Sequence, residues 1–107
     1  MSFIRVHWKH SIPSEPVLLY SELDKNRFEI RKLEIWADGH CGYADSNEEF
    51  GDTRLGAVTT PPLSEIAKQR EFEPSEIVGQ EFESVWARRK SSLRDMILLN
   101  DDKEAIE

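Results

Sequence analysis

The chain has 107 residues, of which 38% are hydrophobic and 33% charged, and its formal net charge is −7. This length fits one domain, and the composition excludes wholesale disorder. No apolar run approaches the roughly 20 residues of a membrane-spanning helix, and the N-terminus lacks the layout of a secretory signal. A single cysteine excludes an internal disulfide and every multi-cysteine zinc site. We therefore expect a soluble, cytoplasmic protein without a membrane partner.

The first third of the chain alternates apolar and polar residues, which is typical of half-buried strands. Residues 3–10 predict one such strand, with Trp8 in the core. A loop with two prolines separates it from strands expected at 17–23 and 27–37. The apolar pairs of the third strand differ in parity, so we expect a β-bulge near Arg31.

A turn is expected where Asp38 precedes Gly39. This dipeptide favours a two-residue type I′ hairpin turn, because both central positions of that turn need positive φ. Such a turn would pair Ile35 with Gly42. A small residue beside a large one indicates a sheet surface shaped to receive a helix.

Two helices are expected after residue 60. Residues 61–69 and 80–96 carry apolar side chains at helical spacing, and Phe82 and Trp86 should face inward. Residues 45–60 show no clear period, although a short strand could form near 55–58.

The predicted fold class is therefore α+β, with an antiparallel sheet of four or five strands and two helices packed on one face. We expect a single domain over residues 1–99 and a polar C-terminal tail over 100–107.

The negative charge is concentrated in residues 45–83, where ten acidic side chains face three basic ones. One interpretation is a solvated face that keeps a small protein soluble. The other is a docking surface for a basic partner, whereas direct binding to nucleic acid is disfavoured. The candidate partner-binding residues are Asp45, Glu48, Glu49, Asp52, Glu71, Glu73 and Glu76.

No motif predicts catalysis, a metal or a cofactor. His7 and His10 have odd spacing on a predicted strand, so they should point to opposite faces. The adjacent His40 and Cys41 should likewise point apart. The glycines of the 51–56 stretch lack a phosphate-binding pattern. We therefore predict no catalytic, metal-binding or cofactor-binding residue, and we do not expect an enzyme.

One internal cluster of charged residues lies near the expected bulge. Its members are Glu29, Arg31, Lys32 and Glu34. We interpret them as cross-strand ion pairs, each contributing little to stability.

Several short motifs together resemble a family of small, largely uncharacterised bacterial proteins. The motifs are Trp8-Lys9-His10, Glu15 to Asp24, Arg31 to Ile35, Asp38-Gly39, Gly42-Tyr43-Ala44, Thr53 to Gly56, Pro61-Pro62 and Phe82 to Trp86. The resemblance spans about residues 5–90 and brings no catalytic residues with it. Members resemble the small acidic immunity proteins encoded beside polymorphic toxins, including those of contact-dependent growth inhibition systems.

The resemblance and the regional charge make an immunity protein the first functional expectation. It would neutralise a cognate toxin, expected to be a basic nuclease, by stoichiometric binding through an acidic surface. A cytosolic regulatory or adaptor module that binds another protein is the second hypothesis. A small hydrolase or nucleic-acid-processing enzyme is the third. The sequence leaves the oligomeric state open.

Overall fold

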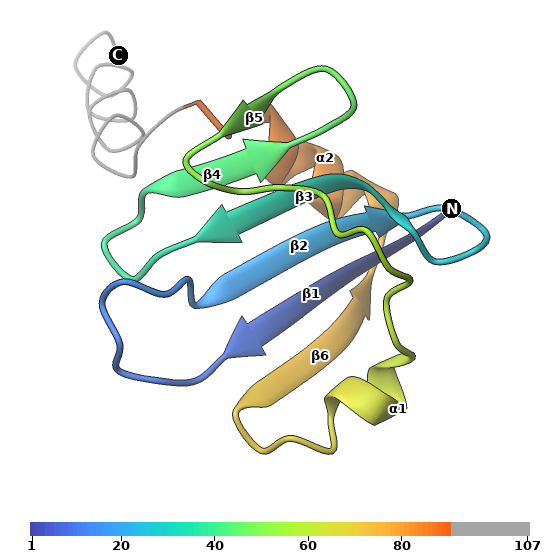
Figure 1. Ribbon diagram of the computed structural model, residues 1–107, viewed down its shortest axis with the longest axis horizontal. Helices are drawn as coiled ribbons and strands as arrows, with labels where there is room; N and C mark the ends of the chain where they lie inside the picture. The colour runs from blue at the N-terminus through green and yellow to red at the C-terminus, as the bar shows by residue number, and fades with distance from the viewer. Residues whose placement is uncertain (91–107) are drawn as a thin grey trace, which may run out of the picture.

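The computed structural model describes residues 1–90, and its strands form one antiparallel sheet (Figure 1). The strands are β1 (Ser2–Trp8), β2 (Leu18–Leu23), β3 (Glu29–Ile35), β4 (Cys41–Ala44), β5 (Glu49–Phe50) and β6 (Phe72–Ile77). The helices are α1 (Leu63–Ile66) and α2 (Gly79–Ala87). The order across the sheet is β5-β4-β3-β2-β1-β6. The predicted α+β class is confirmed.

The sheet has six strands where the sequence predicts four or five. Two of them were not predicted: β5, in a stretch without clear period, and β6, in a stretch expected only to end a helix. The predicted strand at 55–58 does not form, and the helix expected at 61–69 is four residues long. Within residues 1–90, no helix has the length and apolar character needed to cross a bilayer. The helix expected at 80–96 ends at Ala87. Its predicted part beyond residue 90, the domain end at 99 and the tail at 100–107 lie outside the described residues.

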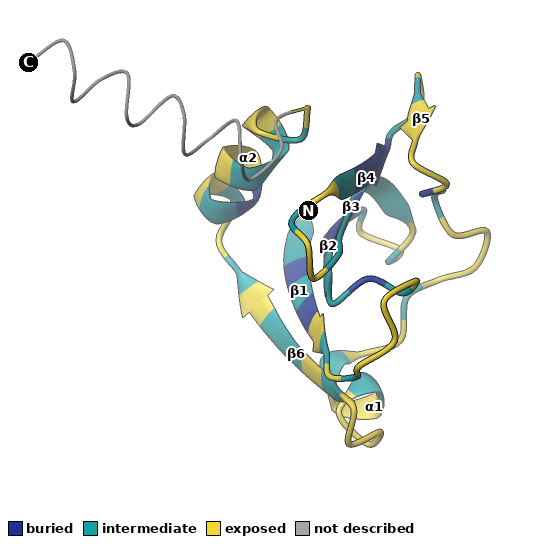
Figure 2. Ribbon diagram, turned by 90° about the vertical axis from the view of Figure 1, so that its left-hand side faces the viewer, coloured by how far each residue is buried: buried dark blue, intermediate teal, exposed yellow. Residues whose placement is uncertain are grey.

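The two helices lie on opposite faces of the sheet, and not on one face as predicted (Figure 2). The face covered by α2, here the α2 face, carries Phe3, Tyr20, Leu33 and Tyr43. The opposite face, here the α1 face, carries Ile4, Val6 and Leu23. Between the helices the chain runs along the edge strand β6, where it can pass from one face to the other. Adjacent side chains on one strand necessarily point to opposite faces.

The β3–β4 hairpin has a register one residue away from the predicted one. Ile35 pairs with Cys41, whereas the sequence analysis pairs Ile35 with Gly42. The loop has three residues, and only Gly39 among them has positive φ, at 91°. A type I turn followed by a left-handed residue is the usual geometry of such a loop. The pairing brings Trp36 and His40 into a stack with ring centroids 4.4 Å apart.

This register places Gly42 on the α1 face, where the following loop packs against it. A Cβ atom at Gly42 would lie 2.1 Å from the Thr53 side-chain oxygen. The predicted role of Gly42 in receiving a helix is therefore wrong, because this glycine makes room for the chain after β5. The bulge predicted near Arg31 occurs at Ile30, where the pairing with β2 shifts by one residue.

Residues 51–62, here the strap, cross the α1 face between β5 and α1 (Figure 1). Hydrogen bonds hold the strap to the sheet and to Arg27 of the β2–β3 loop. The Thr53 hydroxyl donates to Glu34 Oε1 (2.8 Å), the Gly56 N–H donates to Glu29 Oε1 (2.7 Å), and Arg27 Nε donates to the Thr60 carbonyl (2.8 Å). The strap and α1 together cover the α1 face.

The edge strand β6 contains Pro74 without losing a ladder bond. The Lys9 N–H donates to the Glu71 carbonyl at 2.7 Å, and Val6 pairs with Pro74 three positions along. Hydrogen-bonded and non-hydrogen-bonded pairs alternate in an antiparallel ladder, so Pro74 falls in a non-hydrogen-bonded pair. Its missing N–H therefore faces outward, as expected of an edge proline. Trp8, predicted to be in the core, is half-buried, and its ring contacts that of Phe72 at a tilt of 39°.

Candidate functional site

The seven acidic residues predicted to bind a partner lie at two opposite edges of the sheet. Asp45, Glu48, Glu49 and Asp52 surround β5, while Glu71, Glu73 and Glu76 lie on or beside β6. The strands β5 and β6 are the first and last of the sheet, so five interstrand spacings, or roughly 24 Å, separate them. The seven acidic residues therefore do not form one continuous surface, although they lie in one segment of the sequence.

The stretch from Asp45 to Asp52, here the acidic hairpin, is held by its first carboxylate. Asp45 Oδ1 accepts hydrogen bonds from the backbone N–H groups of Asn47 (2.8 Å) and Glu48 (2.9 Å). These two bonds hold the pKa of Asp45 below its ordinary value. Asp45 thus shapes the turn as well as adding charge to it.

Glu48 connects the acidic hairpin to α2. Its Oε1 atom lies 3.4 Å from the guanidinium of Arg89. That guanidinium also lies over the Trp86 ring, 4.3 Å from its centroid, and over the Tyr43 ring at 5.2 Å. The charge of Glu48 is therefore partly balanced, and Glu48 contributes to the docking of α2.

Glu49 and Asp52 are exposed, and between them Phe50 presents an aromatic ring to solvent. Phe50 is 57% exposed and stacks on Tyr43 with the ring centroids 5.2 Å apart. The stack orients a ring that the surrounding carboxylates do not cover. Glu49, adjacent on β5, points to the other face, where its carboxylate lies 3.9 Å from Arg54. An exposed aromatic side chain on an edge rich in charge is a candidate anchor for a protein partner. The sequence analysis missed Phe50. An apolar residue inside an acidic stretch was the feature that could have indicated it.

The β6 edge differs from the acidic hairpin in chemistry. Glu73 pairs with Lys9 Nζ at 2.8 Å, and this hydrogen bond lowers the pKa of Glu73. Glu71 and Glu76 are exposed, and no exposed aromatic side chain lies among them. Pro74 also removes one outward backbone donor from this edge. Charged residues and proline are common devices against strand addition.

The charged cluster near the bulge is divided between the two faces of the sheet. Arg31 lies on the α2 face, where it donates hydrogen bonds to Glu22 of β2 and to both carboxylate oxygens of Glu83 of α2. These bonds lower the pKa of Glu83 and raise that of Arg31. The guanidinium also lies 4.8 Å from the Phe82 ring centroid. Arg31 therefore fastens α2 to the sheet.

Glu29, Lys32 and Glu34 point to the α1 face instead. Glu29 lies 3.7 Å from Lys32, but both glutamates also accept hydrogen bonds from the strap. The interpretation of the cluster as cross-strand ion pairs is therefore incomplete, because Glu29 and Glu34 mainly anchor a distant segment. Strand parity alone would place Glu29 on the same face as Arg31, and the bulge at Ile30 moves it to the α1 face. Nothing local in the sequence indicates the anchoring.

The histidines and the cysteine have structural partners. His10 Nε2 lies 2.7 Å from the Pro16 carbonyl, and its Nδ1 atom accepts the Ile12 N–H at 2.9 Å, so both ring nitrogens are occupied. His7 is exposed. Burial raises the pKa of the Cys41 thiol to about 11, which leaves it protonated near neutral pH. Within residues 1–90, no three His, Cys, Asp or Glu side chains gather as a metal site would require.

Comparison with known families places the chain in one of them. Residues 2–91 match the family described as a domain of unknown function, DUF6881, and the chain belongs to that family. The matched range contains every helix and strand described above. No curated protein and no solved structure matches the chain.

Proposed function

We propose that this DUF6881 protein is a bacterial immunity protein that neutralises a cognate toxin by stoichiometric binding in the cytoplasm. The acidic hairpin is the proposed contact surface, and a basic nuclease domain is the proposed partner. Chemistry by the inhibitor is not needed, since covering the toxin is enough.

The observation that carries this proposal is Phe50, exposed at a sheet edge between Glu49 and Asp52. Buried aromatic residues contribute much of the affinity at protein interfaces, and surrounding charges accelerate association. A nuclease must present basic surface to a phosphate backbone. An acidic edge with a central aromatic ring suits that surface in charge and in shape.

The test compares charge reversals at the two edges, with the product of a neighbouring toxin-like reading frame as the partner. One variant carries Glu49→Lys and Asp52→Lys, and the matched control carries Glu71→Lys and Glu76→Lys. Both variants change the net charge equally. Asp45 and Glu48 are left intact because they hold the turn and α2.

We expect the hairpin variant to associate with the toxin about tenfold more slowly at low salt, with a smaller effect at high salt. The control should associate at nearly the wild-type rate. Phe50→Ala should mainly accelerate dissociation. Equal slowing by both reversals would indicate a general charge effect and would contradict docking through the acidic hairpin.

The adaptor hypothesis predicts a different result. A protein of this kind would fail to neutralise the neighbouring gene product, and a pull-down from native cytosol would recover a housekeeping protein instead. Turnover that is lost on replacing one particular carboxylate or histidine would favour the enzyme hypothesis. Either outcome would overturn the immunity proposal.

A further inference from the structure

A pocket of about 310 Å³ lies on the α1 face, and none of the residues that line it belongs to the acidic hairpin. Its floor is formed by the sheet, including Ile4, Val6 and Leu19, and its walls include Ile66 of α1 and Phe72 of β6. Most of the surface that lines it is apolar. Small-molecule sites are typically concave and apolar with a few polar groups, and their volumes begin near 300 Å³.

Two charged side chains of β3, Glu29 and Lys32, line the pocket. The Glu29 carboxylate has hydrogen-bond donors from the protein. Glu29 accepts hydrogen bonds from the Ser21 hydroxyl at 2.9 Å and from the Gly56 N–H at 2.7 Å. Its side chain is only 10% exposed. The Glu29 carboxylate is therefore compensated by the protein and does not need a ligand.

Lys32, the second charged side chain, is not compensated in the same way. Its Nζ atom lies 3.7 Å from Glu29 Oε1, which is longer than a hydrogen bond, and its side chain is 19% exposed. Within residues 1–90, Nζ makes no hydrogen bond to protein. An ammonium group carries three donors. The pocket therefore contains donor capacity that an oxygen acceptor would satisfy.

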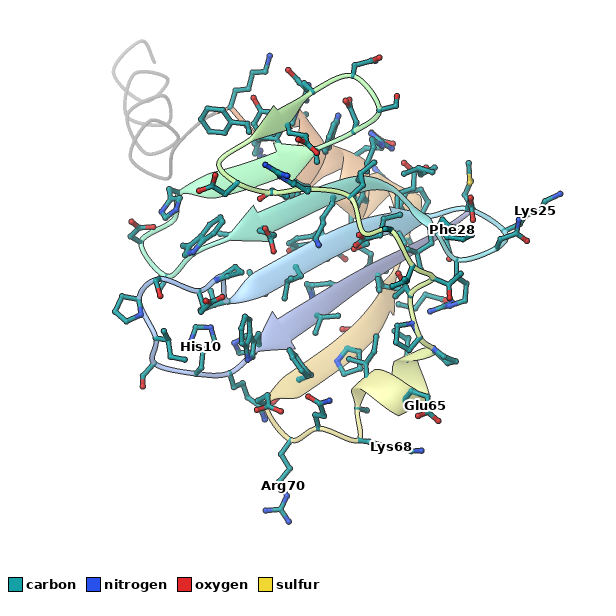
Figure 3. All side chains as sticks on the ribbon, in the orientation of Figure 1. His10, Lys25, Phe28, Glu65, Lys68 and Arg70 are labelled. Carbon is teal, nitrogen blue, oxygen red and sulfur yellow. The ribbon has the colours of Figure 1, made fainter. Side chains whose placement is uncertain are left out.

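The charges that line the pocket cancel. Lys32 and Glu29 balance each other, and Glu65 at the rim pairs with Lys68 at 3.0 Å (Figure 3). An ionic ligand would lose its hydration here without meeting a net opposite charge. An uncharged ligand would avoid that cost.

We propose that this pocket binds a small uncharged amphiphile, with its oxygen acceptor on Lys32 and its apolar body against Leu19, Ile66 and Phe72. Water occupies about 30 Å³ per molecule in the liquid, so 310 Å³ holds roughly ten heavy atoms. An amide or ketone with a chain of about eight carbons matches this size. The inference does not rest on the proposed toxin partner, because the pocket shares no residue with the acidic hairpin.

The test uses octanamide as the probe, with octanoate and octylammonium as charged analogues of equal chain length. Binding to the full chain is followed by NMR shifts of the backbone amides. We expect saturable shifts centred on Ser21, Lys32 and Ile66, and an affinity for octanamide about tenfold above that for either ion.

Two variants test the role of the ammonium group. Lys32→Met keeps the stem but removes the donors, so octanamide affinity should fall about tenfold, as expected for a hydrogen bond to a charged group. Lys25→Met, at an exposed position that does not line the pocket, should bind as the wild type does. Unchanged affinity in Lys32→Met would overturn the proposal.

The wild-type protein alone can also decide the matter if Lys32→Met does not fold. Equal affinities for the three probes would indicate nonspecific adsorption of the alkyl chain. The absence of saturable shifts with a folded protein would show that the pocket is a packing gap. Each of these results would reject the proposed site.

Discussion

The two faces of the sheet are built by different physical means. On the α2 face, Phe82 is completely buried, and the guanidinium groups of Arg31 and Arg89 lie over the Trp86 ring, 5.1 and 4.3 Å from its centroid. On the α1 face, the four-residue helix α1 packs on a small apolar cluster, the strap is held by hydrogen bonds to Glu29 and Glu34, and a pocket remains. The first face combines buried aromatic rings with ion pairs and cation–π contacts at α2, whereas the second combines a smaller apolar cluster with hydrogen bonds that anchor the strap. Substitutions should therefore affect the two faces differently.

The largest effect is expected from Phe82→Ala on the α2 face. Removing a fully buried aromatic ring leaves a cavity, and the free energy of unfolding should fall by about 3–5 kcal/mol. Chemical denaturation measures this change. Val78→Ala, at a residue 67% exposed beside the same helix, is the control and should change stability very little. A loss below about 1 kcal/mol would show that α2 contributes little to the core.

Gly42→Ala should have the largest effect on the α1 face. Its new Cβ atom would lie 2.1 Å from Thr53 Oγ1 and 3.1 Å from the Phe50 carbonyl, so the strap must move. Overpacking of this kind typically costs about 1–3 kcal/mol. Thr53→Ala in the same chain removes the closest contact, so the double variant should be less destabilised than the sum of the single variants. Simple additivity would show that the strap does not pack on Gly42.

A smaller effect is expected when one strap anchor is removed. Thr53→Val keeps the shape of the side chain but loses the hydrogen bond to Glu34, which should cost about 1–2 kcal/mol. Amide hydrogen exchange should accelerate over residues 51–56 and remain slow in α2. Thr59→Val, at an exposed position in the same strap, is the control. Uniform acceleration across both faces would contradict separate stabilisation of the strap.

The smallest effect on stability is expected from lowering the pH. Arg31 holds the pKa of Glu83 below its ordinary value, so this carboxylate stabilises the folded state above its unfolded pKa, near 4.3. The contribution is lost as the pH falls through the lower, folded pKa. Melting temperatures measured from pH 7 to pH 3 should therefore decline less steeply for Glu83→Gln than for the wild type. Parallel curves would mean that the Arg31 pair does not fasten α2.

Local patterns predicted the strands of the first half well, because alternation reports which side of a strand is buried. The register of the β3–β4 hairpin was wrong by one residue. Asp38-Gly39 is compatible with both loop lengths, and here Gly39 alone adopts positive φ while Trp36 stacks on His40. The strand β6 escaped prediction because Pro74 and three glutamates resemble a loop. Pairing with β1 along Phe72–Ile77 forms that strand.

For the candidate site, the sequence predicted only which segment is acidic. The acidic residues 45–83 were evident, but their division between two sheet edges was not. The same holds for Phe50, whose exposure depends on β5 being an edge strand. Glu29 was interpreted through its sequence neighbours, although its hydrogen-bond donors include Gly56, which is 27 residues away.

The sequence by itself determined the α+β class, the central strands and the buried position of Phe82, because these depend on periodicity within short windows. Only the tertiary structure decided that the helices cover opposite faces, that the acids divide between two edges, and that Lys32 reaches a pocket below α1. These features depend on which distant strands pair and on the face to which each residue then points. A register shift of one residue exchanges the two faces, so local patterns cannot determine them.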